Sequence, residues 1–533
     1  MSDRTGPILL MVAFGAMLGF VAFLLIGPRG ADAGLVAGSD TTVPVASPGE
    51  TGTEGTASGA TTPGDATTTT VAGGGNGSRE PNTVPGSTVG QPWGTMTGLG
   101  MFRGNPTRTW YGTGPISDSP SVAWTYPDGG MCSESTNLGA TTTWCGMGWT
   151  GQPAVWERPD GVTELIFGAY DRAIHFVDAD TGEDTRPRFV TGDLIKGSVT
   201  IDPDGFPLMY TGSRDNEFRI IALDREEPTE LWSMHAEDVD GTWNDDWDGN
   251  ALIIDDIMYE GGENGWFFAH ELNRRYDDSG QVTVDPQRLI SMPSYTQELL
   301  SLAGPNVSIE NSVAAFEQRV YFANSAGRIV GLDVSNVRDG EAPIVFDFWA
   351  GGDIDASLVI DEEGMVYASV NVKPAQVGQG YRTQANIDRT REIGQLIKLD
   401  PYADGDPLLW AVDLASEGGE DSGTWATPAL YEGLLYTNTH LGSLIVVDTA
   451  TGETVWQDGT VGWHSWSSPA VVDGTLVVPT CAGDVRGYSL ADPRSPERLW
   501  SVSLGETCLE ATPAIWNGTI YLGSRDGYLR AIR

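Results

Sequence analysis

The amino-acid sequence predicts an all-β fold, and specifically an eight-bladed β-propeller. Residues 466–504 contain four short β-rich runs joined by turns, among them the tight-hairpin signal Asp473-Gly474. The opening of this unit recurs until eight copies can be placed, at intervals of roughly 40 to 70 residues. A single four-stranded unit cannot bury both of its faces, so it needs neighbours, and the repeated array supplies them.

Each repeat has the same order of elements. The opening strands begin at Gly151, Gly197, Gly249, Asn311, Ala356, Ala426, Ser467 and Ala511. A second strand follows each opening, usually with a third. The fourth strand often carries tryptophan, at Trp232, Trp349, Trp410, Trp456 and Trp500.

The last repeat stops at Arg533 after three strands, while residues 122–126 resemble a fourth strand upstream of the first repeat. An open array would leave bare strand edges, and pairing of residues 122–126 with the last repeat would remove them. We therefore expect a ring closed by an N-terminal strand, with Trp124 in the place that Trp456 and Trp500 hold in their repeats.

Three stretches carry a family resemblance. Residues 511–533 match a pattern S/T-P-A-V-x-x-G followed by V-Y-x-G-S-x-D-G-x-L-x-A, residues 447–456 match D-x-x-T-G-x-x-x-W, and residues 101–108 match a lead-in segment. This pattern resembles the pyrroloquinoline-quinone-like propeller repeat, over about residues 93–533. The resemblance implies a propeller. The family includes quinoprotein alcohol dehydrogenases and non-enzymatic scaffolds such as the lipoprotein that assists outer-membrane protein assembly, so the fold leaves the function open.

The N-terminal residues predict a membrane anchor. Residues 8–26 form an uncharged apolar run that is long enough to cross a bilayer. Residues 31–33 read Ala-Asp-Ala, which leaves a cleaved signal peptide as the alternative. Arg4 and Arg29 flank the run equally and do not orient it. We expect one transmembrane helix in residues 1–29, in a single-pass protein of the cell membrane.

A spacer and the propeller domain follow the anchor. Residues 30–92 are rich in Thr, Gly, Ser, Ala and Pro and poor in large apolar side chains, so they predict a disordered linker. Residues 93–533 form the predicted propeller. We expect this domain to be extracytoplasmic, in the periplasm or at the cell surface, and monomeric.

The charge balance excludes several partners. The chain has 73 acidic against 30 basic residues and a formal net charge of −43. Nucleic acid is excluded because its phosphates require Lys and Arg, and docking of the domain surface to anionic lipid is excluded for the same reason. Membrane contact is expected through the N-terminal helix alone.

Four cysteines allow three disulfide pairings, and none of their spacings matches a zinc site. In the propeller all four lie in connections that emerge on one face. The simplest assignment is therefore Cys132–Cys145 with Cys481–Cys508. Such disulfides indicate an oxidising compartment.

Long insertions predict where a partner binds, because insertions on one face of a propeller often carry function. They span residues 234–248, 293–310, 371–394, 415–425 and 457–466. They and the first connection are rich in aromatic residues, namely Trp144, Trp149, Trp243, Trp247, Trp425, Trp463 and Trp466, with His235 and His464. A protein, a peptide or an envelope glycan is the expected ligand; the alternative is that these rings only pack the loops together.

One residue per repeat, just before each opening strand, should line the mouth of the central channel. These residues are Thr150, Lys196, Asp248, Glu310, Asp355, Trp425, Trp466 and Glu510. Converging carboxylates suit a hard cation such as Ca²⁺. The alternative is a solvated ring in which Lys196 pairs with a neighbour.

Catalytic motifs do not support a specific reaction. The sequence lacks G-x-S-x-G, H-E-x-x-H and a P-loop, and residues 178–183 look like a calcium loop but fit an ordinary blade turn. The resemblance implies that a quinoprotein would need a disulfide of adjacent cysteines, and the chain has no Cys-Cys pair and no C-x-x-C-H haem site. We therefore favour a non-enzymatic binding or scaffolding module with no catalytic residue and no cofactor. The alternative is an alcohol or sugar dehydrogenase that uses pyrroloquinoline quinone and Ca²⁺. A glycan hydrolase or lyase remains a third hypothesis.

Overall fold

The computed structural model describes residues 82–137, 140–149 and 151–533. The predicted anchor in residues 1–29 and most of the predicted linker lie outside these residues. Among the helices of the described part, none has the length and apolar character that a membrane crossing needs.

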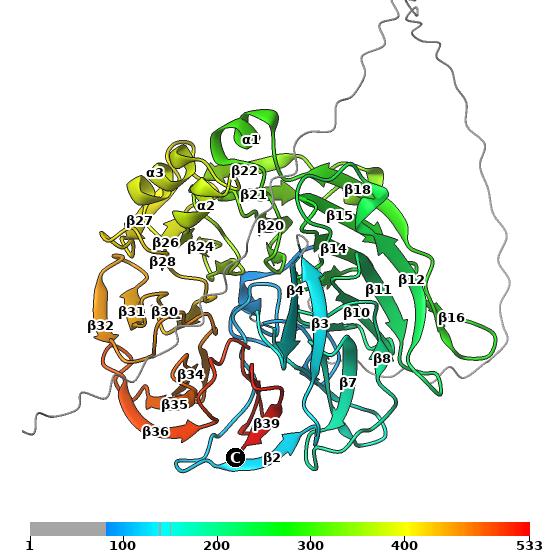
Figure 1. Cartoon of the computed structure of the whole chain (residues 1–533). Coiled ribbons are helices and arrows are strands. Elements are labelled where there is room, and N and C mark those ends of the chain that lie inside the picture. The colour runs from blue at the N-terminus through cyan, green and yellow to red at the C-terminus, as the bar shows by residue number, and fades with distance from the viewer. Residues whose placement is uncertain (1–81, 138–139, 150) are drawn as a thin grey trace, which may run out of the picture. The chain divides into compact units, whose positions relative to one another are not determined.

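Eight antiparallel sheets surround a common centre in the described part (Figure 1). The first sheet contains β1 (Gly98–Leu99), β5 (Ala154–Glu157), β6 (Thr163–Ala169), β7 (Ala173–Asp178) and β8 (Phe189–Val190). The second contains β9 (Thr200–Ile201), β10 (Leu208–Gly212), β11 (Glu217–Ala222) and β12 (Thr229–His235). The third contains β13 (Leu252–Ile254), β14 (Ile257–Gly261), β15 (Trp266–Glu271) and β18 (Gln287–Pro293). The fourth contains β19 (Ala314–Phe316), β20 (Arg319–Ala323), β21 (Arg328–Asp333) and β22 (Ile344–Trp349).

The remaining four sheets repeat this plan. The fifth contains β23 (Val359–Ile360), β24 (Val366–Ser369), β26 (Leu396–Leu399) and β27 (Leu408–Val412). The sixth contains β29 (Ala429–Tyr431), β30 (Leu434–Asn438), β31 (Leu444–Asp448) and β32 (Thr454–Asp458). The seventh contains β33 (Ala470–Val472), β34 (Thr475–Pro479), β35 (Asp484–Ser489) and β36 (Glu497–Ser503). The eighth contains β37 (Ala514–Trp516), β38 (Thr519–Gly523), β39 (Leu529–Ile532) and β2 (Val122–Tyr126). The predicted eight-bladed β-propeller is confirmed.

The sequence pattern explains the blades. Strands β10, β14 and β38 are buried along their whole length, because neighbouring sheets cover both of their faces. The hairpin between β33 and β34 turns at Asp473 and Gly474, whose φ angles are 47° and 71°. Two positive φ angles define the tight turn that an Asp-Gly pair favours, as the sequence predicted.

Strand β2 supplies the outer strand of the eighth sheet, where Trp124 lies opposite Ala531. The indole of Trp124 donates to Ala179 O of the first sheet at 3.2 Å, and a Cβ on Gly182 would lie 2.8 Å from its ring. Trp410 of the fifth blade makes the same contact with the sixth: it donates to Thr449 O at 2.9 Å and packs on Gly452. The eighth and first blades thus meet through the same contact as the fifth and sixth.

Residues 178–183 form the blade turn that the sequence predicted instead of a calcium loop. Asp178 Oδ1 accepts hydrogen bonds from the backbone N–H groups of Asp180 and Thr181. Asp448 Oδ1 accepts the equivalent bonds in the sixth blade, from Ala450 and Thr451. An oxygen already satisfied by its own turn explains why this motif recurs as a structural element.

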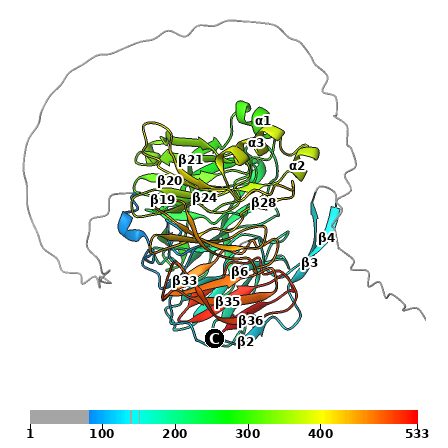
Figure 2. The same cartoon turned by 90° about the vertical axis from the view of Figure 1, so that its left-hand side faces the viewer.

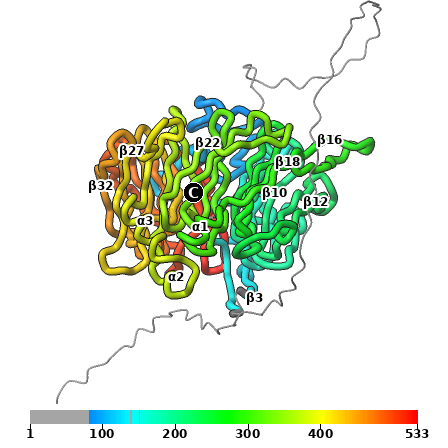
Figure 3. The backbone as a smooth tube through the Cα atoms, turned by 90° about the horizontal axis from the view of Figure 1, so that it is seen from above, coloured from blue at the N-terminus to red at the C-terminus, as the bar shows by residue number. Residues whose placement is uncertain are grey.

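The insertions gather on one face, which we name the loop face. It carries the helices α1 (Gln297–Ala303), α2 (Ala375–Gly378) and α3 (Gln384–Ile393), and the hairpin of β3 (Cys132–Asn137) and β4 (Ala140–Cys145) (Figure 2). Helices α1 and α3 begin after Thr296 and Thr383, whose hydroxyls accept from the backbone of the first turn. The first described residues lie on the opposite face, as the view along the ring's edge also shows (Figure 3).

Smaller elements complete the architecture. Two further two-stranded sheets pair β16 (Arg275–Tyr276) with β17 (Val282–Thr283) and β25 (Asn371–Val372) with β28 (Ser422–Gly423). Short 3₁₀ turns are η1 (Gly86–Thr88), η2 (Ala236–Asp238) and η3 (Val337–Asp339). Packing begins before the predicted domain boundary at residue 93, because Val84 is fully buried and exchanges backbone hydrogen bonds with Glu317 at 2.8 and 2.6 Å.

Residues 98–113, which we name the plug, run across the inner ends of the blades. Strand β1 pairs with β5, and the carbonyls of Gly100, Pro106 and Thr107 accept from the second, fourth and fifth sheets. The N–H of Thr113 donates to Ile515 O of the eighth sheet. Tyr111 Oη accepts from Leu430 N of the sixth sheet at 2.7 Å. One segment therefore joins six blades at the centre.

Two buried arginines hold the plug in place. Arg103 Nη2 donates to Thr427 O at 2.5 Å, and its guanidinium lies 4.9 Å from the Tyr111 ring centroid. Arg108 Nη1 donates to Phe102 O at 2.7 Å, while Nε and Nη2 donate to Val313 O. Burial lowers the pKa of Arg103 to about 10 and that of Arg108 to about 9, so both remain protonated at neutral pH.

Replacing Arg108 with Ala should lower the free energy of unfolding by about 3 kcal/mol, because two buried carbonyls lose a charged donor and a cavity remains. The matched control is Arg498→Ala on an exposed strand position, which should change it by less than about 0.5 kcal/mol. Denaturant unfolding of both variants measures the difference. Equal losses in the two variants would show that the plug does not stabilise the ring.

Both predicted disulfides are present: Cys132–Cys145 and Cys481–Cys508. Cys132 and Cys145 join the two strands of the β3–β4 hairpin, and Cys481 and Cys508 join two connections of the seventh blade. Cys481 Sγ also lies 3.1 Å from His464 O. The second disulfide therefore borders the loop that carries Trp463 and Trp466.

The double substitution Cys481→Ala and Cys508→Ala should lower the free energy of unfolding by about 3 to 4 kcal/mol, as expected for a closed loop with a sequence separation of 27. Peptide mapping without reduction establishes the wild-type pairing, and thermal unfolding compares the variants. An unchanged melting temperature would show that this disulfide does not constrain the unfolded chain.

Candidate functional site

The residues predicted to line the channel mouth converge in the structure, apart from Thr150, which lies outside the described residues. Lys196 Nζ contacts Asp246 Oδ2 at 2.9 Å, Asp248 Oδ2 at 2.5 Å and Glu263 Oε1 at 2.8 Å. The ammonium also lies 5.6 Å from the Trp149 ring centroid. The sequence placed Lys196 and Asp248 at the mouth but missed the two other carboxylates, which enter from neighbouring loops.

A second cluster surrounds Asp355. Asp355 Oδ2 accepts from Lys373 Nζ at 3.1 Å and from Asn371 Nδ2 at 3.0 Å. Lys373 also pairs with Asp353, which in turn pairs with Arg382 at 2.5 Å. The Lys373 ammonium lies 5.0 Å from the Trp425 ring centroid. Lys373 and Arg382 come from the 371–394 insertion, and no sequence signal distinguishes them from surface cations.

Glu510 belongs to a third group at the edge of the mouth. Its Oε2 lies 3.8 Å from Arg525 Nη1, and a Cβ on Gly148 would lie 2.6 Å from the same oxygen. The Arg525 guanidinium lies 4.7 Å from the ring centroids of Trp144 and Tyr170. Glu510 is thus near the mouth but does not line its central pocket.

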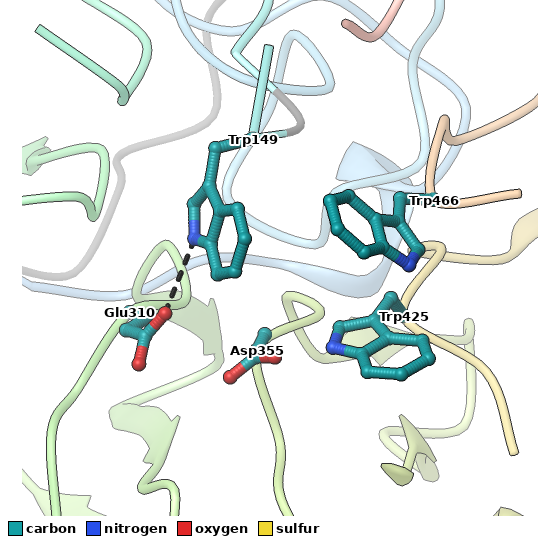
Figure 4. Close-up of a pocket in the computed structure, with 5 residues that line it drawn as sticks. All are labelled: Trp149, Glu310, Asp355, Trp425 and Trp466. Atoms are coloured by element: carbon teal, nitrogen blue, oxygen red, sulfur yellow. Dashed lines mark hydrogen bonds between the residues drawn. The ribbon is translucent and has the colours of Figure 1, made fainter. Parts of the chain in front are cut away.

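The central pocket is a box of three tryptophans and two carboxylates, which we name the tryptophan box: Trp149, Glu310, Asp355, Trp425 and Trp466 (Figure 4). The ring centroids of Trp149 and Trp466 are 5.4 Å apart, and those of Trp425 and Trp466 are 5.6 Å apart. Trp149 Nε1 donates to Glu310 Oε2 at 3.1 Å. The sequence predicted four of these five residues as mouth positions; it had placed Trp149 among the loop aromatics.

His440 supports the box from outside. Its ring centroid lies 4.0 Å from that of Trp425, and its Nδ1 accepts from Trp466 Nε1 at 3.3 Å. Burial, with smaller contributions from His464 and Lys373, lowers the pKa of His440 to about 3. A neutral imidazole therefore orients two of the three indoles.

Burial is the largest influence on the pKa of Glu310 and of Asp355. It raises the pKa of Glu310 to about 8, with further contributions from the charges of Asp355 and Glu263. It raises the pKa of Asp355 to about 6, together with the neighbouring charge of Asp353. For Lys196, burial alone would lower the pKa, but Asp246, Asp248 and Glu263 outweigh it and raise the pKa above its usual value.

The predicted aromatic residues divide into rings that pack the loops and one ring that is exposed. Trp247 is 1% exposed and packs against Phe218, and Trp243 packs edge-on against Tyr381. His235 caps η2 by accepting from Glu237 N. Trp463, by contrast, is 59% exposed beside His464. Some rings therefore pin the loops, while Trp463 leaves an apolar ring exposed on the loop face.

The site does not fit the calcium and quinone of a quinoprotein. Asp246, Asp248 and Glu263 bring one carboxylate oxygen each within 4.8 Å of one another, as a cation site requires, but the Lys196 ammonium already contacts all three. The tryptophan box leaves a cavity of about 10 Å³ for the centre of a water-sized group, which is too small for a fused-ring quinone.

The blades and the tryptophan–glycine contact between them define the described part as an eight-bladed β-propeller. A family model described as "Outer membrane protein assembly factor BamB" matches residues 389–533, which confirms the predicted resemblance over that stretch.

Of three similar solved structures, the one with a TM-score above 0.5 supports the fold. Sqt1 from Saccharomyces cerevisiae is similar with a TM-score of 0.52 at 9% identity, over 78% of this chain and 98% of that chain. BamB from Moraxella catarrhalis has a TM-score of 0.48 at 14% identity, over 78% and 97%. The computationally designed Ika8 protein has a TM-score of 0.46 at 11% identity, over 69% and 92%. No curated protein matches the chain.

Replacing Glu310 with Gln should make the pH dependence of stability flatter. The folded pKa of about 8 lies above the unfolded value of 4.5, so the folded state holds a proton that the unfolded state has lost between these pH values. Wild-type stability should therefore fall as the pH rises from 5 to 8, by at most about 1.4 kcal/mol per pH unit from this group. Glutamine does not titrate, so the stability of the variant should not fall with pH through this position.

Denaturant unfolding at pH 5, 6.5 and 8 measures the effect, with Glu417→Gln on an exposed loop position as the control. The stability of Glu310→Gln relative to wild type should increase with pH, while that of the control should stay constant. A constant difference for both variants would contradict a protonated Glu310.

Proposed function

We propose that the chain is a membrane-anchored, extracytoplasmic propeller that binds a protein partner on its loop face and acts as a scaffold. The observation that carries the proposal is that the two faces of the ring carry different elements. The loop face holds the three α-helices and both disulfides, whereas the opposite face holds the plug. Pinned loops reduce the ordering cost of binding, as a preformed docking surface requires.

The carboxylates of the mouth support binding rather than catalysis. Asp248 and Asp353 are held by lysine or arginine of this chain, and His440 is held by Trp466. Contacts within the chain therefore already engage each of these groups, as expected for residues that shape a binding surface. The match of residues 389–533 to a family of outer-membrane protein assembly factors also favours a role in contacts between proteins.

The proposed location rests on the sequence and the disulfides. Residues 8–26 have the length and apolar character of a membrane anchor, and two disulfides suit an oxidising compartment. We therefore place the domain in the periplasm or at the cell surface, carried by residues 1–29 and spaced by the linker. A monomeric propeller, and an envelope glycan as a second kind of ligand, belong to the same proposal.

Site-specific photo-crosslinking in the full chain tests this function. A photoreactive phenylalanine analogue replaces Trp463 on the loop face or, as the matched control, Leu499 on the outer strand β36; both positions are exposed. In membranes of the source cell, position 463 should crosslink to one defined protein and position 499 should not. Trp463→Ala should weaken binding of that protein about tenfold or more. Equal crosslinking at both positions, or dye-linked alcohol oxidation after addition of quinone and Ca²⁺, would overturn the proposal.

A further inference from the structure

The tryptophan box combines aromatic faces with carboxylates, and only neutral groups satisfy Glu310. Glu310 accepts from Trp149 Nε1 at 3.1 Å, from Ser308 Oγ at 2.7 Å and from Ser325 Oγ at 3.1 Å. Among the described residues, no lysine or arginine forms an ion pair with it. A buried carboxylate without a cation is costly unless it is protonated or a cation binds.

Two lysines of the chain show that an ammonium group fits between carboxylates and a tryptophan ring at this mouth. Lys196 and Lys373 each place an ammonium between at least two carboxylates and beside a tryptophan face, at 5.6 Å from Trp149 and 5.0 Å from Trp425. The sequence contains only three lysines, so two of them serve this arrangement. Both ammoniums lie against residues of the box, namely Trp149, Trp425 and Asp355. Glu310 is the carboxylate of the box that pairs with neither lysine among the described residues (the box is drawn in Figure 4).

Unpaired polar atoms point to a ligand in the same place. Asp355 is 9% exposed, and its Oδ1 has no hydrogen-bond partner among the described residues. Trp425 is 5% exposed, and its Nε1 likewise has none there. Figure 4 shows the Trp425 nitrogen on the side of the ring that faces Asp355. Buried polar groups normally have partners, so these atoms mark an incomplete site.

The size of the box selects among cations. Its cavity of about 10 Å³ has room for the centre of one water-sized group, which matches –NH₃⁺ and excludes a quaternary ammonium. An ammonium also donates hydrogen bonds, which Asp355 and Glu310 can accept, and it is attracted to tryptophan faces.

We infer that the tryptophan box binds a primary ammonium group, supplied by a lysine side chain of the protein partner. The inference rests on the proposed function and specifies the partner's chemistry: a basic surface with a protruding lysine. The net charge of −43 favours such a partner, because complementary charge steers association and selects partners. The lysine stem would pass the exposed Trp463 ring or its neighbours, where an alkyl chain has apolar contacts.

Titration of the full chain with n-butylammonium, followed by tryptophan fluorescence, tests the site without any partner. Saturable binding is expected, at least tenfold tighter than that of 1-pentanol, tetramethylammonium or K⁺. Asp355→Asn and Trp425→Phe should each weaken binding at least fivefold. Asp240→Asn, an exposed loop carboxylate, should leave it within twofold and serves as the control. Melting curves of all variants exclude unfolding as the cause.

The outcomes separate this inference from the proposed function. Equal binding of 1-pentanol, tetramethylammonium or K⁺, or unchanged binding in both box variants, would overturn the ammonium site even if crosslinking still identifies a partner. Where a partner is identified, acetylation of its lysines should reduce its binding at least tenfold. Undiminished binding after acetylation would overturn the assignment of the ammonium to a partner lysine. Butylammonium binding without any crosslinked partner would instead contradict the proposed function.

Discussion

The plug is the constraint on which the ring depends. A propeller blade contacts only its two neighbours, so small errors in blade packing would accumulate around eight sheets. Residues 98–113 prevent this because they bond the inner ends of six sheets to one continuous segment. Arg103 and Arg108 carry this role at full burial. Arg103 donates to the Thr427 carbonyl and lies against the Tyr111 ring, and Arg108 donates to the carbonyls of Phe102 and Val313. A planar donor with five N–H groups suits carbonyls that converge from several blades.

The plug closes one end of the channel, and the charged residues of the mouth lie at the other end. Because the plug occupies the inner ends on its side, the residues before each opening strand converge on the loop face, and most of them are charged. Lys196 and Lys373 neutralise the carboxylates on two sides of the mouth. Helix α3 and its threonine cap hold the insertion from which Lys373 and Arg382 reach inward. One insertion, residues 371–394, therefore supplies two of the counter-charges of the mouth, while Lys196 comes from the repeat itself.

The sequence predicted what repeats and missed what does not. Eight openings, the tryptophans of the outer strands, both disulfides and the mouth positions follow from a periodic pattern, so one blade in register places all the others. Asp246, Glu263, Asp353 and Lys373 escaped prediction because each reaches the mouth from a loop of its own length, and only three-dimensional packing brings them together. Packing of Val84 on Glu317 was missed for a related reason: a single apolar residue inside a polar stretch gives no periodic signal.

The mouth also shows two ways in which the protein accommodates carboxylates that are withdrawn from water. Removing water from a carboxylate is costly, and the chain meets this cost at Asp248 and Asp353 with lysine or arginine. At Glu310 it meets the cost with a proton, since burial raises the pKa to about 8 and the group is neutral at pH 7. A cation that binds beside this carboxyl group would lower its pKa, so the proton would dissociate. A lysine of the chain is covalently attached and stays at its carboxylate. In the box, Glu310 therefore has only neutral partners, and three tryptophans surround a cavity with room for the centre of one water-sized group.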